Sequence, residues 1–402
     1  MLMNIDQQQI DLIRKEFASM RSKDDLVLLL ESAKKFFIDT KSKPILLSDL
    51  SYYANPDLCK KRYNGFIVKK KSGGMRIINA PAPGLKFILR ILNFVLQCMY
   101  EPHDAATGFV IGKSIVDNAK LHVGNHYVLN LDLKDFFHSF DRNRVKLGLM
   151  NKPFNLYGDR EPLAFMIACL CTHPIEIDGE IKNVLPQGSP TSPIITNILC
   201  NKLDRRLTGL ANRFGAKYSR YADDITFSSP HNVYDVVFHQ ELERIIKEDN
   251  LFKFSEKKEI VIGPQLNINT EKTRLQKSEY RQEVTGLIVN KKVNVRQRYL
   301  KQIRMWLYYW EKYGYENAQL IFLRDYHIDK GHVKKGVPNL INVLEGKLLF
   351  LRMVKGANDS TYKKLQARFI KLSSEESLIY KVINVWEKEG IERAIHVYNT
   401  MN

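Results

Sequence analysis

The chain has 402 residues, of which 44% are hydrophobic and 10% aromatic, which excludes a disordered polymer and allows a sizeable core. Lysine and arginine number 62 against 44 aspartate and glutamate residues, and the formal charge of +18 favours a polyanionic partner, nucleic acid before lipid. The longest apolar run, at 163–171, is far shorter than the ~20 residues of a transmembrane helix, so no membrane partner is expected.

The first 50 residues are predicted to form a helical extension. Apolar residues at helical spacing indicate one helix around 10–17 and another around 26–37. Asp6 and Asp11 lie near the start of the chain, which is unlike a signal peptide. The five cysteines include no C-x-x-C pair, so they are expected to be free thiols in a reducing cytoplasm.

Strand patterns follow in the next part of the chain. Residues 65–80 read as strand, turn and strand, with Gly73 and Gly74 in the turn of a hairpin. The segment 127–132 reads as a strand that ends in Asp132, and 218–227 reads as a second hairpin with two aspartates at its tip. No Pro/Gly-rich linker interrupts residues 50–290, so one continuous body is expected there.

The aspartates at the tip of the second hairpin are Asp223 and Asp224. Adjacent carboxylates repel each other unless they share a cation, and a third carboxylate on a neighbouring strand would complete an oxygen site suited to Mg²⁺. An Asp-Asp pair in a turn is also ordinary by itself. The other motifs of the chain therefore have to decide between the two interpretations.

The last 112 residues form the more densely basic part, with a net charge of +10 against +8 for the first 290. Their apolar residues around 299–310 fall at helical spacing, which predicts a packed helix. The basic residues of that helix lie at other positions of the turn and are Arg298, Lys301 and Arg304. They indicate either a solvated face or a surface for phosphates.

Five motifs occur in the order and at the spacing of a reverse transcriptase, which this sequence resembles. Tyr-Ala-Asp-Asp at 221–224 resembles the YxDD box, and 131–137 resembles the first carboxylate motif. Residues 185–193 resemble the motif that the family places between these two. Residues 269–273 resemble its N-x-x-K-T motif, and residues 65–81 resemble its fingers hairpin. Five motifs in order are not plausibly a coincidence.

The resemblance implies a right-hand polymerase of the α+β class, with fingers, a palm made of an antiparallel sheet packed on helices, and a helical thumb. The expected parts are an N-terminal helical extension at 1–50, fingers and palm at 51–290, and a basic helical thumb at 291–402.

The resemblance also implies a site for two Mg²⁺ ions held by Asp132, Asp223 and Asp224. Lys272 resembles the motif lysine proposed to protonate the leaving pyrophosphate, although a solvated lysine is the plain alternative. Attack on an α-phosphate needs charge neutralisation more than a protein nucleophile, which agrees with these assignments.

A deoxynucleotide pocket is implied around the same motifs. Phe137 would lie under the sugar, where its ring would clash with a ribose 2′-OH and select dNTPs; a core aromatic is the compatible alternative. Which lysine of 69–71 points inward cannot be decided from the sequence. The residues assigned to the pocket are Lys69, Arg76, Asp135, Phe136, Phe137, Gln187 and Gly188. Ser192 is expected to cap the helix that follows.

Two further motifs resemble those of bacterial retron reverse transcriptases: NAxxH at 118–122 and Val-Thr-Gly at 284–286, with similar stretches at 106–109 and 112–115. Such an enzyme in the bacterial cytoplasm binds a cognate structured noncoding RNA as template and primer. It primes from the 2′-OH of an internal guanosine, makes the branched RNA–DNA called msDNA, and acts with a separate effector protein in anti-phage defence.

RNA contacts are expected at these two motifs and on the basic helix. The structural alternatives are that the Asn and His brace a helix and that the Thr-Gly pair shapes a turn. The residues assigned to RNA binding are Asn118, His122, Val284, Thr285, Gly286, Arg298, Lys301 and Arg304.

Other functions stay open as alternatives. A group II intron-like or other bacterial reverse transcriptase would share the polymerase motifs, but the intron type usually has a larger C-terminal region than the 116 residues that follow Gly286. A catalytically silent RNA-binding protein on the same scaffold would not need the complete set of three aspartates, which are costly to keep close together.

Overall fold

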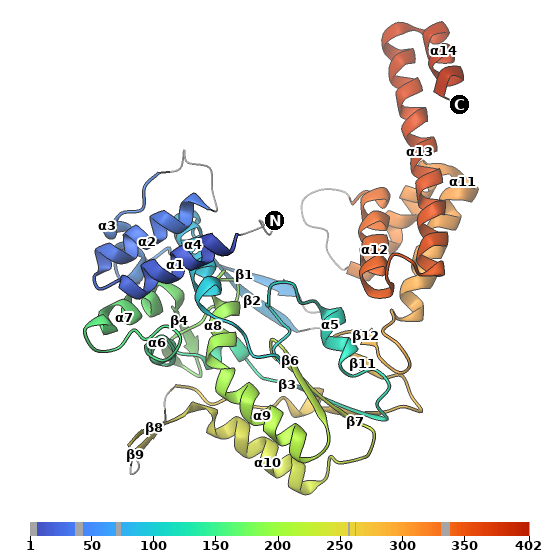
Figure 1. Cartoon of the computed structure of the whole chain (residues 1–402). Coiled ribbons are helices and arrows are strands. Elements are labelled where there is room, and N and C mark those ends of the chain that lie inside the picture. The colour runs from blue at the N-terminus through green and yellow to red at the C-terminus, as the bar shows by residue number, and fades with distance from the viewer. Residues whose placement is uncertain are drawn as a thin grey trace. The chain divides into compact units, whose positions relative to one another are not determined.

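Figure 1 shows the computed structural model of the chain, which describes residues 6–36, 43–69, 74–255, 258–261, 263–330 and 338–401. The chain divides into two compact units, Met1–Thr285 and Gly286–Asn402. The expected three-part division with boundaries at 50 and 290 stays a prediction.

The first unit begins with three helices: α1 (Gln7–Ser19), α2 (Lys23–Lys35) and α3 (Leu47–Ala54). Side chains of Asp6 and Ser22 cap the first two by accepting hydrogen bonds from the first turn. The apolar faces of α1 and α2 pack with α4 (Pro83–Met99), so these helices share the core of the unit. The helical N-terminal segment predicted from periodicity is therefore present.

The fingers hairpin consists of β1 (Tyr63–Lys69) and β2 (Met75–Pro81), paired antiparallel. Lys69 pairs with Met75, which brings the two strands together at the predicted turn. The turn itself, 70–73, lies outside the described residues, and with it lie two of the three lysines proposed for the triphosphate.

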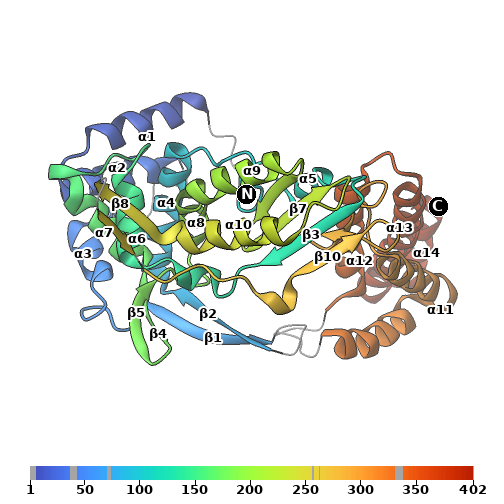
Figure 2. The ribbon, with the colours of Figure 1, turned by 90° about the horizontal axis from the view of Figure 1, so that it is seen from below.

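The central sheet has the strand order β10-β3-β7-β6, with every neighbouring pair antiparallel. Helices α9 (Asn201–Arg213) and α10 (Val236–Lys247) cover it, and the Phe238 ring of α10 lies 5.2 Å from the Phe227 ring of β7 (Figures 1 and 2). This is the predicted α+β arrangement. The strands are β3 (Tyr127–Asp132), β6 (Lys217–Tyr221), β7 (Asp224–Ser229) and β10 (Arg274–Lys277).

Shorter elements complete the first unit. Its remaining helices are α5 (Ile115–Lys120), α6 (Arg142–Met150), α7 (Glu161–Cys171) and α8 (Ser192–Leu199), with 3-10 turns at Phe136–Ser139, Gly158–Arg160, Glu248–Asn250 and Thr270–Lys272. Its remaining strands are β4 (His173–Ile177), β5 (Glu180–Val184), β8 (Leu251–Ser255), β9 (Lys258–Val261) and β11 (Glu283–Val284). All five cysteines are buried free thiols, as predicted.

The second unit is built mainly from helices. After β12 (Leu287–Ile288) come α11 (Gln297–Lys330), α12 (Leu340–Lys355), α13 (Ser360–Glu389) and α14 (Ile391–Met401). Gly314, with φ of 76°, interrupts the helical geometry of α11. The apolar positions predicted for this helix, such as Ile303, Trp306 and Trp310, are buried.

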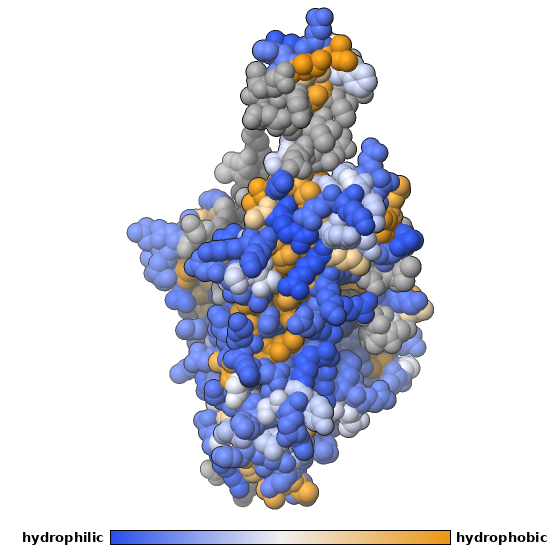
Figure 3. Space-filling model, turned by 90° about the vertical axis from the view of Figure 1, so that its right-hand side faces the viewer, coloured by the Kyte–Doolittle hydropathy of each residue, from blue (hydrophilic) through white to orange (hydrophobic). Residues whose placement is uncertain are grey.

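Hydrophilic residues predominate on the face shown in Figure 3, in keeping with a chain of which 26% is charged. Within the described ranges, no helix has both the length and the apolar character that are needed to cross a bilayer.

Candidate active site

The predicted carboxylates meet at one end of the central sheet. Strands β3 and β7 are antiparallel neighbours, and their register places Asp132 directly opposite Asp224. Asp223 precedes β7 in the hairpin turn, where its carbonyl accepts a hydrogen bond of 3.1 Å from the backbone N–H of Leu133. The hairpin tip is thereby tied to the end of β3, so residues some 90 positions apart share one site.

A buried arginine, Arg220, stabilises the turn that carries Asp223. Ala222 has a φ of 60°, a left-handed conformation that costs a residue with a Cβ about 1 kcal/mol. The Arg220 guanidinium donates to the Ala222 carbonyl at 3.2 Å and forms a fully buried ion pair with Asp204 at 2.6 Å. Sequence reasoning missed both residues, although an arginine directly before the motif, inside a predicted strand, was a signal that could have suggested a buried acidic partner.

Loss of hydration and, after it, crowding of negative charge raise the pKa values of two of the carboxylates. Loss of hydration, and then the charges of Asp223 and Asp132, raise the pKa of Asp224 to about 6. The pKa of Asp223 is raised for the same reasons, whereas the positive charges of Lys272 and Arg76 oppose the rise. A cation is therefore favoured at this position, which is the electrostatic property that a metal site requires.

Lys272 already supplies one positive charge. Its Nζ donates to both carboxylate oxygens of Asp132, at 2.8 and 2.9 Å, from the 3-10 turn that directly precedes β10. Asn269 supports this contact, because its backbone N–H donates to the Asp132 carbonyl at 2.7 Å and its side chain approaches the Asp132 carboxylate at 3.3 Å. The role of Asn269 was not anticipated from the sequence beyond its place in the motif.

The donor set has the chemistry of a magnesium site, because it consists of carboxylate oxygens only. Among the histidine, cysteine, aspartate and glutamate side chains that the structure describes, however, no group of three is placed so that it could hold a metal ion. The ammonium of Lys272 is the cation that contacts Asp132 instead.

The three residues after Asp132 that were assigned to the nucleotide pocket differ in their exposure. Asp135 is exposed in a left-handed conformation with φ of 43°, which starts the 3-10 turn. Phe136 is only 3% exposed and belongs to the core, so its side chain does not line an accessible pocket, contrary to the expectation. Phe137 is half-buried and packs against the same core, with its ring 5.7 Å from that of Phe136.

An aromatic residue that had been given no role stands beside Phe137. The Phe109 ring lies 6.3 Å from the ring of Phe137 and 6.4 Å from that of Tyr221, and 40% of Phe109 is exposed. The preceding Gly108 is needed for this approach, because a Cβ there would lie 2.5 Å from the backbone nitrogen of Ala222. The segment 106–109 was noted in the sequence only as a family-like stretch.

The loop at Gln187 and Gly188 touches the fingers. The backbone N–H of Asn79 in β2 donates to the Gln187 carbonyl at 2.7 Å, and Gly188 has a φ of 122°. A Cβ at 188 would lie 2.7 Å from the Asn79 carbonyl oxygen, so glycine is required there. Ser192 does not cap the next helix as expected: it is the first helical residue, and its hydroxyl donates to the Pro186 carbonyl at 2.8 Å.

The two cationic residues proposed for the triphosphate, Lys69 and Arg76, lie in strands β1 and β2 of the fingers hairpin, as the strand pattern predicts. Arg76 lies opposite Val68 in the β1–β2 register, and both Arg76 and Lys69 are exposed. The charge of Arg76 acts on the pKa of Asp223, which indicates that Arg76 lies on the side of the hairpin near the carboxylates.

Asn118 and His122 are buried, so the expectation of direct RNA contact is not supported for either side chain. The two ring nitrogens of His122 lie 2.7 Å from the hydroxyls of Ser219 and Ser228 in strands β6 and β7. Asn118 accepts a hydrogen bond of 2.7 Å from Ser219. These contacts brace α5 against the palm sheet, which is the structural alternative considered above.

The other residues assigned to RNA are also unequal in exposure. Val284 is buried, and Thr285 and Gly286 have positive φ values of 47° and 80°, which is a turn geometry. The buried valine cannot contact RNA directly, while Gly286 is exposed. The three basic residues of α11 that were assigned to RNA are exposed, whereas the apolar stripe of the helix is buried; they are Arg298, Lys301 and Arg304.

Comparison with known proteins agrees with the motif order. Residues 68–289 match the reverse transcriptase (RNA-dependent DNA polymerase) family. The retron Mx162 reverse transcriptase of Myxococcus xanthus is 38% identical over 57% of this chain and 47% of its own length. The retron Ec86 reverse transcriptase of Escherichia coli is 33% identical over 60% of this chain and 68% of its own length.

Among solved structures, the alignment with a telomerase from Candida albicans in complex with a fragment of telomeric RNA covers 96% of this chain and 79% of the telomerase chain, with a TM-score of 0.39 at 12% identity. The chain spans about half the length of the Myxococcus relative. The family match over more than half of the chain and the identity to the retron Ec86 enzyme lead to one conclusion: the chain belongs to the reverse transcriptase family, in its bacterial retron branch.

Proposed function

We propose that the protein is an RNA-directed DNA polymerase of the retron type. The observation that carries this proposal is the register of β3 and β7, which sets Asp132 opposite Asp224 with Asp223 in the adjoining turn. Deoxynucleoside triphosphates are the substrates, and an RNA strand is the template.

The proposal assigns a part in this reaction to six of the nominated residues. Asp132, Asp223 and Asp224 would hold two Mg²⁺ ions, which would supply Lewis-acid chemistry to the phosphate and to the attacking hydroxyl. Lys272, now held by Asp132, is near enough to the carboxylates to donate a proton to the pyrophosphate that leaves. Arg76 and Lys69 bind the triphosphate from the fingers.

Selection of deoxynucleotides is assigned to Phe137. Its ring is half-buried against Phe136 and Phe109, and this packing limits its movement. A ring held in this way excludes the ribose 2′-OH by steric contact rather than by hydrogen bonding, so truncating it removes the discrimination.

The template and primer are proposed to be one cognate structured noncoding RNA. Priming from the 2′-OH of an internal guanosine gives the branched RNA–DNA product, msDNA, which acts with a separate effector protein in anti-phage defence in the bacterial cytoplasm. The similarity to retron reverse transcriptases supports this extension.

The test is to express the chain in a bacterium together with several hundred flanking nucleotides of its locus, and to extract the small nucleic acids. We expect a short DNA whose mobility changes on treatment with debranching enzyme, and no such DNA from the Asp223→Asn/Asp224→Asn variant. An unbranched DNA would replace the retron proposal with another bacterial reverse transcriptase. RNA that copurifies with the wild-type chain while no DNA forms would support the silent RNA-binding alternative.

A further inference from the structure

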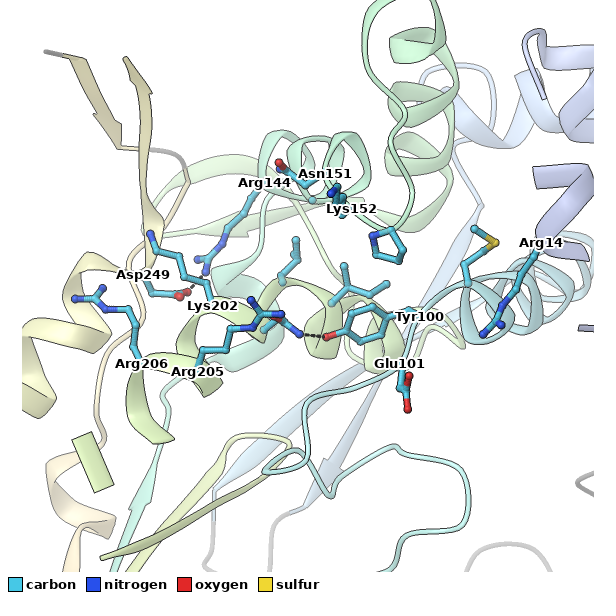
Figure 4. Close-up of a pocket in the computed structure, with 16 residues that line it drawn as sticks. Arg14, Tyr100, Glu101, Arg144, Asn151, Lys152, Lys202, Arg205, Arg206 and Asp249 are labelled. Carbon is cyan, nitrogen blue, oxygen red and sulfur yellow. Dashed lines mark hydrogen bonds and ion pairs between the residues drawn. The ribbon is translucent and has the colours of Figure 1, made fainter. Parts of the chain in front are cut away.

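A cavity of about 1050 Å³ lies in the first unit, apart from all the candidate active-site residues. Its walls come from α1, the end of α4, α6, the end of α8 and the start of α9 (Figure 4). None of the residues assigned above to metal, nucleotide or RNA lines it. The mechanism of polymerisation therefore does not account for this cavity.

Positive charge predominates on its walls. Six cationic side chains face only two carboxylates, Glu101 and Asp249. The cations are Arg14, Arg144, Lys152, Lys202, Arg205 and Arg206. Three of them come from the first turns of α9 at positions i, i+3 and i+4, which places them on one face of that helix. The opposite face of the helix buries leucines in the core, so the cations are kept together by the fold.

Some of these charges are already neutralised within the protein. Arg144 forms a buried ion pair with Asp249, and Arg206 pairs with Glu248 at 2.6 Å. Arg205 and Lys152 have no carboxylate within 4 Å in the part of the chain that the structure describes. The cavity thus keeps a positive surplus after its internal pairs are counted.

Two further observations point to a ligand in the cavity rather than to a solvated surface. The side chain of Arg144 is 2% exposed, and its Nη1 has no hydrogen-bond partner in the part of the chain that the structure describes. The neighbouring Asp249 Oδ1 lacks a donor, which an anion would not supply. Loss of hydration, aided by the charges of Arg206 and Arg144, lowers the pKa of Lys202, although Asp249 opposes this. An anion in the cavity would stabilise the charged form of Lys202 and offer Arg144 an acceptor.

We propose that this cavity binds the sugar–phosphate backbone of an RNA strand outside the polymerase site. Guanidinium groups grip phosphate oxygens in a bidentate manner, and the walls between the cations carry apolar groups such as Tyr100, Ile198 and Leu199 that suit a sugar or a base. A nucleic-acid strand is favoured over an acidic protein because the proposal rests on the proposed function, in which the protein holds a structured RNA.

The test compares Arg205→Glu with Arg213→Glu in the full chain. Both arginines are exposed on α9 and both changes reverse one charge, but only Arg205 lines the cavity. The probe is a 40-nucleotide RNA of mixed sequence, and its affinity is measured over a range of salt concentrations. Loss of one phosphate contact should lower the slope of log K against log salt by ~0.7 and weaken binding about fivefold at 0.1 M salt. Arg205→Lys should retain the wild-type slope.

Polymerisation on a short primer–template hybrid is measured in parallel, so that the two proposals can fail separately. Weaker RNA binding by Arg205→Glu alone, with or without polymerase activity in the wild type, supports the cavity. Equal slopes for Arg205→Glu, Arg213→Glu and wild type overturn it, even if the wild type polymerises normally. Inorganic tripolyphosphate is the probe for a small free anion. If it raises the melting temperature of the wild type only, while RNA affinity is unchanged in Arg205→Glu, the assignment to RNA is also overturned.

Discussion

The buried arginine behind the aspartate turn offers the sharpest test of how the fold positions the site. Replacing Arg220 with methionine keeps an unbranched stem as long as the chain from Cβ to Nε but removes the guanidinium. Among the described residues, Asp204 would then keep the Tyr218 hydroxyl, at 2.8 Å, as its one side-chain hydrogen-bond partner while it remains fully buried. The Ala222 carbonyl would lose the donor that holds the turn in its left-handed conformation.

The size of the effect follows from the burial of the pair. Removing one partner of a buried ion pair leaves an uncompensated charge, which costs about 3–5 kcal/mol of unfolding free energy. Arg220 also gives up contacts of 2.7 Å to Asp204 through Nε and of 3.2 Å to Asn197. Removing both charges, in Arg220→Met/Asp204→Leu, should restore at least about 2 kcal/mol of the loss, because no buried charge is left alone.

The chain offers separate probes for its two units. All five cysteines lie in the first unit and are buried. Burial raises the pKa of both Cys171 and Cys200 to about 12, so these thiols stay unreactive until that unit unfolds. All three tryptophans, at 306, 310 and 386, lie in the second unit. The urea concentration at the midpoint of thiol labelling should therefore fall in Arg220→Met. The midpoint of the tryptophan fluorescence transition serves as the internal control.

Stability and positioning can then be told apart. In the double variant we expect the thiol-labelling midpoint to recover but DNA synthesis to stay at least tenfold below wild type, because the turn that carries Asp223 is still unsupported. A loss below about 1 kcal/mol in the single variant would refute the buried-charge argument. Wild-type polymerase activity in the double variant would refute the positioning role of Arg220.

Three further outcomes are expected. Phe137→Ala should lower the preference for dNTPs over rNTPs by about tenfold or more in single-nucleotide incorporation, and an unchanged preference would reject the gate. In metal-free buffer, Asp224→Asn should raise the unfolding free energy at pH 7.5 but not near pH 4. The reason is that the pKa of Asp224 is raised to about 6 in the folded protein, so stability is lost as pH rises through that value. Equal gains in unfolding free energy at both pH values in urea melts would contradict this. Burial lowers the pKa of His122 to about 3, so stability is lost as pH falls below 6.5. His122→Asn should reduce that acid sensitivity without changing RNA affinity at pH 7.5, whereas weaker binding by a folded variant would restore a direct RNA contact.

Much of the scaffold could be predicted from local sequence patterns. The alternation that ends in Asp132 marks β3 with both of its bounds, and the hairpin with Asp223 in its turn follows from residues within a dozen positions. The buried stripe of α11 follows from helical periodicity. These features depend on near neighbours along the chain, which is why their position could be inferred without the fold.

Errors in the prediction arose where a side chain's partner is distant in sequence. Asn118 and His122 were assigned to RNA through the family resemblance, with bracing of a helix as the alternative, and the fold buries them against Ser219 and Ser228 of the sheet. Phe136 was likewise assigned to an accessible pocket but is part of the core.

The sequence by itself determined the order of the motifs, the type of each main element and the presence of three aspartates that had to meet. Only the tertiary structure decided that Arg220 pairs with Asp204, that Phe109 lies beside Phe137, and that basic residues of α9 line one wall of a cavity. The physical reason is that periodicity and turn chemistry are local, whereas burial and charge pairing are set by the packing of segments that the sequence leaves far apart.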